Sequence, residues 1–313
     1  MSSVPQAPGD TGFTSARKRR GDTIFAGLSL SAGVTILVVL FLVAAFLLWQ
    51  ALPAITAAPE EVRGGQGLVH YIAPLLFGTV VAAVIALLVG TPLAIGIALF
   101  ISHYAPRRLA SLLGYIIDLL AAVPSVIFGL WGFYVFGPWL MPTQRGLIEY
   151  LGFIPLFGGP ASPKSMLVTG LVLAIMILPI ITSMSREIFT QTPKLHEEAA
   201  LALGATRWEM IRMAVLPFAR PGIISSIMLA LGRALGETMA VALVLSSGPM
   251  IASLIKSGNQ TIAAEIALNF PEAYGLRLSE LIAAGLVLFL ITLVVNMIAR
   301  AIIARYKEFS GAN

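Results

Sequence analysis

An arginine and a glutamate stand four residues apart in the apolar run "ALGRALGETMAVAL", residues 230–243. A charge at the centre of a membrane-spanning helix costs roughly 2.5–3.5 kcal/mol on insertion scales, so Arg233 and Glu237 need a reason to be there. An arginine at such depth ordinarily faces a protein interior or a wet cavity, and its planar fork matches phosphate-type oxygens. The pair is therefore a candidate lining for an anion pathway.

A purely structural role is the alternative for this pair. On one helix Arg233 and Glu237 would neutralise each other across a turn, although base before acid is the weaker order. Gly232 and Gly236 flank them in a G-x-x-x-G spacing, which lets a second helix approach closely. We therefore expect a stripe for tight helix packing beside a polar stripe on the same helix, with Arg233 near the membrane midplane.

The composition places this run in a membrane protein. Of 313 residues, 58% are hydrophobic and 11% are charged, whereas about 25% are charged in an ordinary soluble domain. Six runs have the roughly 20 apolar residues that cross a bilayer. They lie near 24–52, 72–101, 111–136, 166–185, 222–247 and 280–303. We expect an all-α polytopic membrane protein of six transmembrane helices, whose first span is retained because it is too long for a signal peptide.

The basic residues predict the orientation. With the N-terminus inside, 14 of the 20 Lys and Arg residues fall in cytoplasmic segments and five in external ones. Cytoplasmic loops carry the excess of Lys and Arg, so both termini should be cytoplasmic. The run "RKRR" at 17–20 is then expected to hold the N-terminus inside rather than to bind nucleic acid. Residues 1–16, rich in Ser, Pro and Gly, are expected to be disordered.

Cysteine and histidine argue against metal or thiolate chemistry. The chain has no cysteine, and its three histidines, His70, His103 and His196, fall in three different connecting segments. Each histidine is expected to be a polar interface residue. We expect no metal site and no cofactor.

The connection between the fourth and fifth spans is patterned as a pair of short helices. Thr192 and Pro193 predict an N-cap with a first-turn proline, and Gly204 predicts the end of the first helix. Thr206 begins a T-x-x-E capping box for a second helix, which Pro217 is expected to end. The pair can pack on its own bundle or offer a rigid surface to a soluble partner, and the pattern alone leaves both open.

The motif in this connection resembles a known family. "EAALALG" at 198–204 and "LP" at 216–217 are similar to the EAA loop of ABC-importer permeases, with Ala214 in place of the usual branched aliphatic residue. The resemblance implies that residues 192–217 form coupling helices seated in clefts of ATP-hydrolysing subunits. It assigns this contact to Glu198, Ala199, Ala200, Gly204, Trp208, Leu216 and Pro217.

Two further stretches narrow the resemblance. "GRALGETMAV" at 232–241 and "DLLAAVPSVIFGLWG" at 118–132 resemble the PstC-type permeases of phosphate ABC importers, and the similarity covers about 17–309. It implies a non-catalytic subunit of the bacterial inner membrane that forms half of a phosphate path. In that family the positions of Arg233 and Glu237 matter for anion passage, and Glu237 would hold Arg233 or limit its grip on the anion.

The resemblance also implies partners and a domain plan. The partners are a PstA-type sister permease, a dimer of ATPase subunits at the cytoplasmic coupling loop, an external phosphate-binding protein and the lipid bilayer. No Walker motif exists in the chain, so ATP would be hydrolysed by another protein. The plan is a basic cytoplasmic N-terminus at 1–23, a permease domain at 24–309 and a cytoplasmic tail at 310–313.

The third span carries a candidate gate. Pro124 removes a backbone hydrogen bond, and Ser125 can help to satisfy the carbonyl that it frees. A kink there could open and close a path, or serve packing alone. Asp118 is the other embedded acid, and it could instead cap helix ends near the cytoplasmic interface.

Three other functions compete with the phosphate importer. The substrate could be another anion. An ion-coupled secondary transporter would favour ionisable groups on several spans and broken helices in matched halves. A membrane enzyme would need converging catalytic groups at one interface. The helix pair at 193–216 favours an importer, because the last two classes do not need it.

Overall fold

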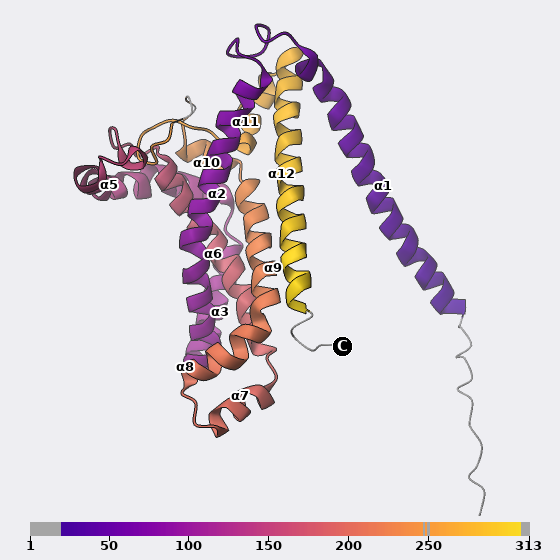
Figure 1. Cartoon of the computed structure of the whole chain (residues 1–313), viewed down its shortest axis with the longest axis vertical. Helices are drawn as coiled ribbons and strands as arrows, with labels where there is room; N and C mark the ends of the chain where they lie inside the picture. Colours follow the sequence, from indigo (N-terminus) through magenta and orange to yellow (C-terminus); the bar gives the residue numbers. More distant parts are fainter. Residues whose placement is uncertain (1–19, 247, 249–250, 308–313) are drawn as a thin grey trace, which may run out of the picture. The chain divides into compact units, whose positions relative to one another are not determined.

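Helices and connecting turns make up the computed structural model, which describes residues 20–246, 248 and 251–307. These residues contain an isolated antiparallel bridge between Ser165 and Ser257 but no strand (Figure 1). The all-α fold is therefore confirmed. The tract expected to be disordered, 1–16, and the tail at 310–313 lie outside the described residues.

Six segments of the described residues are long and apolar enough to cross a membrane, which confirms the predicted number. The long helices are α1 (Arg20–Thr56), α2 (Leu68–Leu99), α6 (Met166–Thr190), α9 (Leu216–Leu235) and α12 (Leu276–Lys307). The shorter helices are α3 (Arg107–Ala121), α4 (Ser125–Trp131), α5 (Gly137–Leu151), α7 (Lys194–Ala202), α8 (Arg207–Met210), α10 (Met239–Val244) and α11 (Ile262–Asn269). The described residues also contain three π-helical stretches and two 3₁₀ turns. The π-helical stretches are η1 (Phe100–Tyr104), η2 (Gly132–Phe136) and η4 (Ile211–Val215), and the 3₁₀ turns are η3 (Pro155–Phe157) and η5 (Phe270–Glu272).

The chain divides into two units, Met1–Trp49 and Gln50–Asn313. The described part of the first unit is the greater part of α1, which is rich in large apolar residues. In the second unit, the last turns of α1 bury Ala51 and Ala54 against Ile72 and Leu75 of α2.

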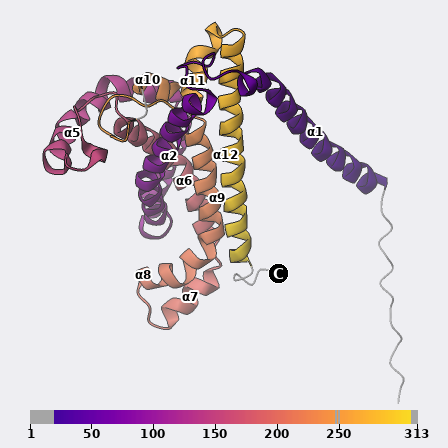
Figure 2. The same ribbon diagram turned by 45° about the horizontal axis from the view of Figure 1, so that its top comes forward.

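A stripe of small residues on α2 builds the centre of the second unit. Every fourth residue from position 82 to position 98 is buried and is alanine or glycine, namely Ala82, Ala86, Gly90, Ala94 and Ala98. Such a stripe lets helix backbones approach closely, and α2 makes its most extensive packing with α6. Figures 1 and 2 show α2, α6 and α9 running side by side.

The third span is broken rather than continuous, so the predicted helix over 111–136 is wrong. Helix α3 ends at Ala121, and Pro124 has an extended ψ of 138° before α4 begins at Ser125. The residue before a proline disfavours helical backbone, and proline lacks the N–H that would continue the ladder. From Ser125 the helical path continues through η2 into α5, which turns away from the bundle (Figure 1).

The predicted fifth span over 222–247 is also wrong at both ends. Pro217 does not end the second loop helix, because α8 continues through η4 into α9 and Pro217 sits in the first turn of α9. The π-helical stretch η4 precedes Pro217 directly. In a regular α-helix the ring of Pro217 would clash with a backbone carbonyl one turn earlier, in the segment that η4 occupies. Helix α9 ends at Leu235, and the chain resumes helical structure only at Met239.

Gly78 gives the first test of this packing. A Cβ at Gly78 of α2 would overlap the backbone carbonyl of Gln260, whereas a Cβ at Gly96 of the same helix meets nothing within 4 Å. We predict that Gly78→Ala lowers the free energy of unfolding by about 1–3 kcal/mol, because backbone must move. The measurement is the thermal unfolding midpoint of the purified chain in detergent.

Gly96→Ala is the matched control for this substitution. It should leave the midpoint unchanged or raise it slightly, since alanine favours helix. Equal midpoints for the two variants would contradict the close approach of the 260 segment to α2.

Candidate functional site

The break after α9 separates the two charged residues found in the sequence. Arg233 lies in the last turn of α9, and Glu237 lies in the non-helical link to α10. Glu237 is 8% exposed, and its Oε1 accepts a hydrogen bond of 3.2 Å from the backbone N–H of Ala240. The expected arrangement on one helix face is therefore wrong, and Glu237 instead satisfies a backbone donor at the start of α10.

Arg233 has no polar partner in the described structure. Its side chain is exposed, and within the described residues it forms no hydrogen bond or ion pair, either with Glu237 or with another group. Its place in the last helical turn suits the negative end of the helix dipole. A guanidinium in that setting has unused donors for an anion.

The two glycines beside Arg233 are uncovered. A Cβ at Gly232 would meet nothing within 4 Å, and one at Gly236 would meet only the carbonyl of Gly232 at 3.4 Å. No helix of the described chain packs on this face. If the predicted close packing at Gly232 and Gly236 occurs, another chain must supply the helix.

The second break holds the candidate gate residues. Pro124 marks the N-cap of α4 and Ser125 is its first residue, so the predicted kink is present as a full interruption. Asp118 lies on α3 with its side chain 59% exposed, 3.7 Å from the guanidinium of Arg186 on α6. That guanidinium lies against Gly114, where a Cβ would collide with it. Asp118 therefore links α3 to the end of α6 and is not deeply enclosed.

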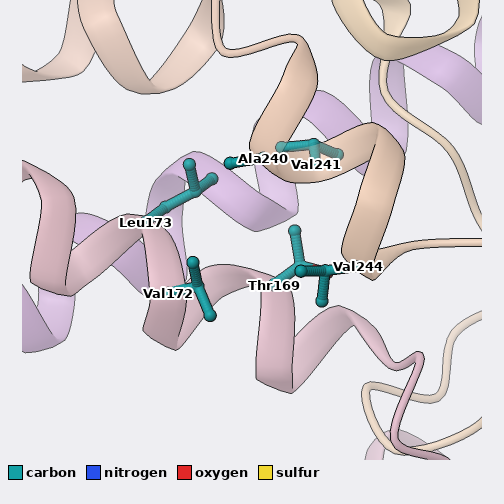
Figure 3. A pocket seen from close by; sticks show the side chains of 6 residues that line it. All are labelled: Thr169, Val172, Leu173, Ala240, Val241 and Val244. Atoms are coloured by element: carbon teal, nitrogen blue, oxygen red, sulfur yellow. The ribbon is translucent and has the colours of Figure 1, made fainter. Parts of the chain in front are cut away.

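The helices that follow the two breaks, α4 and α10, are in contact with each other. Helix α4 packs on α10, and they come so close at Gly129 that a Cβ there would lie 2.8 Å from the Cα of Ala240. Beside this crossing, α10 and α6 enclose an apolar cleft (Figure 3), lined by Thr169, Val172, Leu173, Ala240, Val241 and Val244. The cleft has no room for a water molecule, so it is packing between helices and not a ligand site.

The predicted helix pair between spans 4 and 5 is present as α7 and α8. Gly204 takes a φ of +84° after α7, the left-handed conformation that glycine adopts without strain. Thr206 and Glu209 form the capping box at α8, with the Thr206 N–H donating to Glu209 at 2.8 Å. The predicted N-cap shifts by one residue, because α7 begins after Pro193 and the hydroxyl of Thr192 is buried without a partner.

One face of the pair is anchored in the protein's own bundle. Ala200 of α7 and Ile211 of η4 are buried, in one cluster with Leu99 of α2 and Phe189 of α6. Leu216 packs against the edge of the same cluster. The pair therefore packs on the ends of α2 and α6, and Figure 2 shows it below the lower end of α9.

Other side chains of the pair are exposed, and several of them are apolar. Among the residues predicted for partner contact, Glu198, Ala199, Gly204, Trp208 and Pro217 are exposed. Several large apolar side chains of the pair are exposed with them, namely Leu195, Leu201, Leu203, Trp208 and Met213. We call these five side chains the apolar docking face. Large apolar side chains exposed in this number on one short segment can mark an interaction surface.

Sequence reasoning missed an ionic cluster at the opposite end of the bundle. Glu265 of α11 is bound by Arg277 of α12 at 2.8 Å and by Tyr71 of α2 at 3.2 Å. Arg277 also pairs with Glu280 at 2.9 Å, and Glu280 accepts the N–H of Arg63 at 2.9 Å. The i, i+3 spacing of Arg277 and Glu280 at the start of the last span was the available signal. We call these five residues the ionic cluster.

Comparison with known proteins agrees with this architecture. The family described as binding-protein-dependent transport system inner membrane component matches residues 90–308. The phosphate transport system permease protein PstC 2 of Mycobacterium tuberculosis is 44% identical over 299 residues, which cover 91% of this chain and 92% of that protein. PstC of Mesorhizobium japonicum is 39% identical over 302 residues, covering 93% and 92%.

Solved structures show the same fold. A chain of a bacterial ABC transporter involved in the import of the acidic polysaccharide alginate aligns with a TM-score of 0.60 at 17% identity, covering 91% of this chain and 96% of that one. A chain of the inward-facing MetNI methionine ABC transporter aligns with a TM-score of 0.52 at 17% identity, covering 76% and 95%. At these identities the likeness concerns the fold alone.

The role of Glu237 at the break can be measured directly. We predict that Glu237→Ala lowers the free energy of unfolding by about 1 kcal/mol, because the Ala240 N–H loses its acceptor. Glu237→Gln keeps a carbonyl acceptor and removes a buried charge, so its thermal midpoint should not fall. An equal fall of the thermal midpoint in both variants would mean that the negative charge of Glu237, and not its hydrogen bond to the Ala240 N–H, stabilises the segment between α9 and α10.

Proposed function

Since this chain belongs to the family of binding-protein-dependent transport system inner membrane components, we propose that it forms half of the translocation path for inorganic phosphate in an ATP-driven importer. The observation that carries the proposal is the unpaired, exposed Arg233 in the last turn of α9, beside the uncovered Gly232 and Gly236. The relatives are phosphate transport permeases, which supports phosphate as the anion.

Arg233 would bind the anion, and its geometry suits this task. A guanidinium offers paired N–H donors that match two phosphate oxygens, and here none of them is used within the described chain. The helix ends two residues later, so non-helical backbone follows the arginine, as it does where transporter helices are interrupted at binding sites. Glu237, fixed at the start of α10, adds a negative charge in the same link and limits how long an anion stays.

A second permease half would complete the path. The face around Gly232, Gly236 and Arg233 has no cover from this chain, and a helix from a sister subunit would bury the glycines while the arginine faced the space between them. We assign this place to a PstA-type subunit. The breaks at Pro124 and at Gly236 would then lie on two elements, α4 and α10, that move together as a gate because they pack tightly.

Two ATPase subunits would supply the energy, one of them bound at the apolar docking face. The pair α7–α8 is rigidly anchored by Ala200 and Ile211, so a push on its outer face is transmitted to α2 and α6. This chain would thus be a non-catalytic subunit that couples hydrolysis elsewhere to the path.

The proposed ATPase contact also supports the orientation expected from the basic residues. An ATPase is cytoplasmic, so α7–α8 would face the cytoplasm, both termini would lie there, and the ionic cluster would face outside. The loops near α5 and α11 would then receive an external phosphate-binding protein. The chain would reside in the bacterial inner membrane with lipid around its outer helices, in line with its six apolar spans.

Phosphate uptake tests the path. We predict that Arg233→Gln reduces uptake by the complex, reconstituted in ATP-loaded proteoliposomes, at least tenfold, because one charge-assisted bidentate contact is worth roughly 1.5–3 kcal/mol. Arg233→Lys should retain part of the uptake, since it keeps the charge and loses the fork. Co-purification of the ATPase must be unchanged.

Arg220→Gln is the matched control, because Arg220 is exposed on the same helix outside the proposed path. Unchanged uptake in Arg233→Gln would remove Arg233 from the path. Uptake of another anion in place of phosphate by the wild type would retain the importer and correct its substrate.

Co-purification tests the docking face. Trp208 is 55% exposed on α8, and we predict that Trp208→Ala lowers ATPase co-purification about tenfold, as expected for an aromatic anchor of an interface. Trp139→Ala on α5, where Trp139 is 70% exposed, is the control and should bind the ATPase as the wild type does. Equal binding by both variants would place the ATPase elsewhere.

A further inference from the structure

His103 stands at the junction of the coupling helices with the bundle. It lies in η1, the π-helical end of α2, and its side chain is 9% exposed. Phe189 of α6 lies edge-on to the imidazole, with ring centroids 6.4 Å apart. The remaining sides of the ring are free for polar contacts, and both of its nitrogens have one.

Each ring nitrogen faces a different element. Nδ1 is 2.7 Å from the hydroxyl of Ser102, in the same π turn. Nε2 is 3.7 Å from Oε1 of Glu197 on α7. The backbone carbonyl of His103 also accepts a hydrogen bond of 3.5 Å from Arg207 on α8. One residue of α2 is therefore bound by both coupling helices.

The serine lets the site hold either charge state of the ring. In the neutral form the Ser102 hydroxyl donates to Nδ1, and the proton on Nε2 points to Glu197. In the charged form Nδ1 donates to the Ser102 oxygen, and the hydroxyl turns to the carbonyl of Ala98, 2.8 Å away. The change needs only a rotation of the hydroxyl, and it converts the Glu197 contact into an ion pair.

The charged groups around the ring are few. Glu197 and Arg207 are the ones that touch His103 in the described structure. Other titratable side chains on the packed elements form no hydrogen bond or ion pair with it, namely Tyr104, Arg107, Arg108, Tyr115, Asp118, Arg186, Glu187, Lys194, His196, Glu198, Glu209 and Arg212. Of these, Arg186 is paired with Asp118. The ring therefore faces one carboxylate, and protonation of the imidazole completes a pair.

We propose that His103 is a positioning residue that fastens α7 to the end of α2 through Glu197, and that protonation of its ring tightens this link. Imidazoles change charge between about pH 5 and 8. A charged ring forms an ion pair with the carboxylate of Glu197, whereas a neutral ring leaves a weaker contact. Since α7 carries part of the apolar docking face, the efficiency of coupling becomes sensitive to cytoplasmic pH. This last step rests on the proposed function.

Hydrogen exchange of α7 tests the link without any need for transport. The full chain is placed in lipid nanodiscs, and exchange of the amides at 197–203 is compared between His103→Gln and wild type at the same pH, so that intrinsic rates cancel. At pH 6 we expect the amides of the variant to exchange roughly fivefold faster than those of the wild type, because losing one interaction of about 1 kcal/mol changes an equilibrium by about that factor. At pH 8 we expect nearly equal exchange rates in the two proteins. Glu197→Gln should behave in the same way.

His196→Gln is the matched control, because His196 is exposed on α7 and has no bond to the ring of His103. It should leave the exchange of α7 unchanged at both pH values. A ratio for His103→Gln that is the same at pH 6 and pH 8 would overturn the protonation link, and a ratio of one at both would overturn the positioning role.

Phosphate moved per ATP hydrolysed by the assembled complex tests the consequence. We expect the ratio of wild type to His103→Gln to be above one at pH 6.5 and to approach one at pH 8, with the ATPase bound equally in both. A complex that binds no ATPase in wild type would overturn the proposed function, whereas the exchange result would stand on its own. A complex that transports with the same pH profile in both proteins would overturn the inference alone.

Discussion

The close packing of α2 against α6 is the contact on which the remaining structure depends. It rests on small residues repeated every fourth position of α2, where a larger side chain would force the helices apart. Lipid supplies no hydrophobic gain for bringing two apolar helices together, so close contact and interhelical hydrogen bonds must do so. One such bond runs from the Thr182 hydroxyl to the carbonyl of Ala94 at 3.3 Å. The same helices anchor the coupling pair at one end and the ionic cluster, through Tyr71, at the other.

Interrupted helices are costly in a membrane, and this chain confines them to one place. Backbone groups that leave a helical ladder need other partners, and non-helical backbone at depth is tolerated where protein or a wet cavity surrounds it. At the link after α9, the carboxylate of Glu237 accepts a hydrogen bond from one of these groups, the N–H of Ala240. At the other break, Pro124 has no N–H, so this residue leaves no backbone donor unpaired. The segments after both breaks pack on each other, while Pro124 and Gly236 themselves stay exposed within the described chain.

Local patterns predicted the coupling pair well. Gly204 and the Thr206 capping box act over three or four residues, and both appear as the sequence indicated. The number of spans could also be predicted, because each span is a continuous run of about 20 apolar residues in the sequence. The third and fifth spans were wrongly predicted to be continuous helices. Hydropathy measures transfer into lipid and does not tell whether an apolar segment is one helix or changes direction, as the chain does at Pro124.

Contacts between distant segments could not be predicted. Glu237 was expected to face Arg233 from a regular helix, and its true partner, the Ala240 N–H, becomes available only because the helix ends first. The ionic cluster joins residues up to 217 positions apart, and nothing in a single sequence pairs Arg63 with Glu280. Arg233 was singled out by the cost of a charge in an apolar run, and within the described residues it forms no hydrogen bond or ion pair.

The ionic cluster has a mechanical consequence. It clamps the first turns of α2 and α12 to α11, so these helices share one fixed end, while their other ends lie near the coupling side. From Tyr71 to His103, α2 spans about 48 Å at 1.5 Å per residue. A tilt of only about 5° around the clamped end would displace the far end by roughly 4 Å, about three quarters of a helical turn. The bundle can thus act as a lever that pivots on the ionic cluster, in which two buried carboxylates, Glu265 and Glu280, bind Arg277.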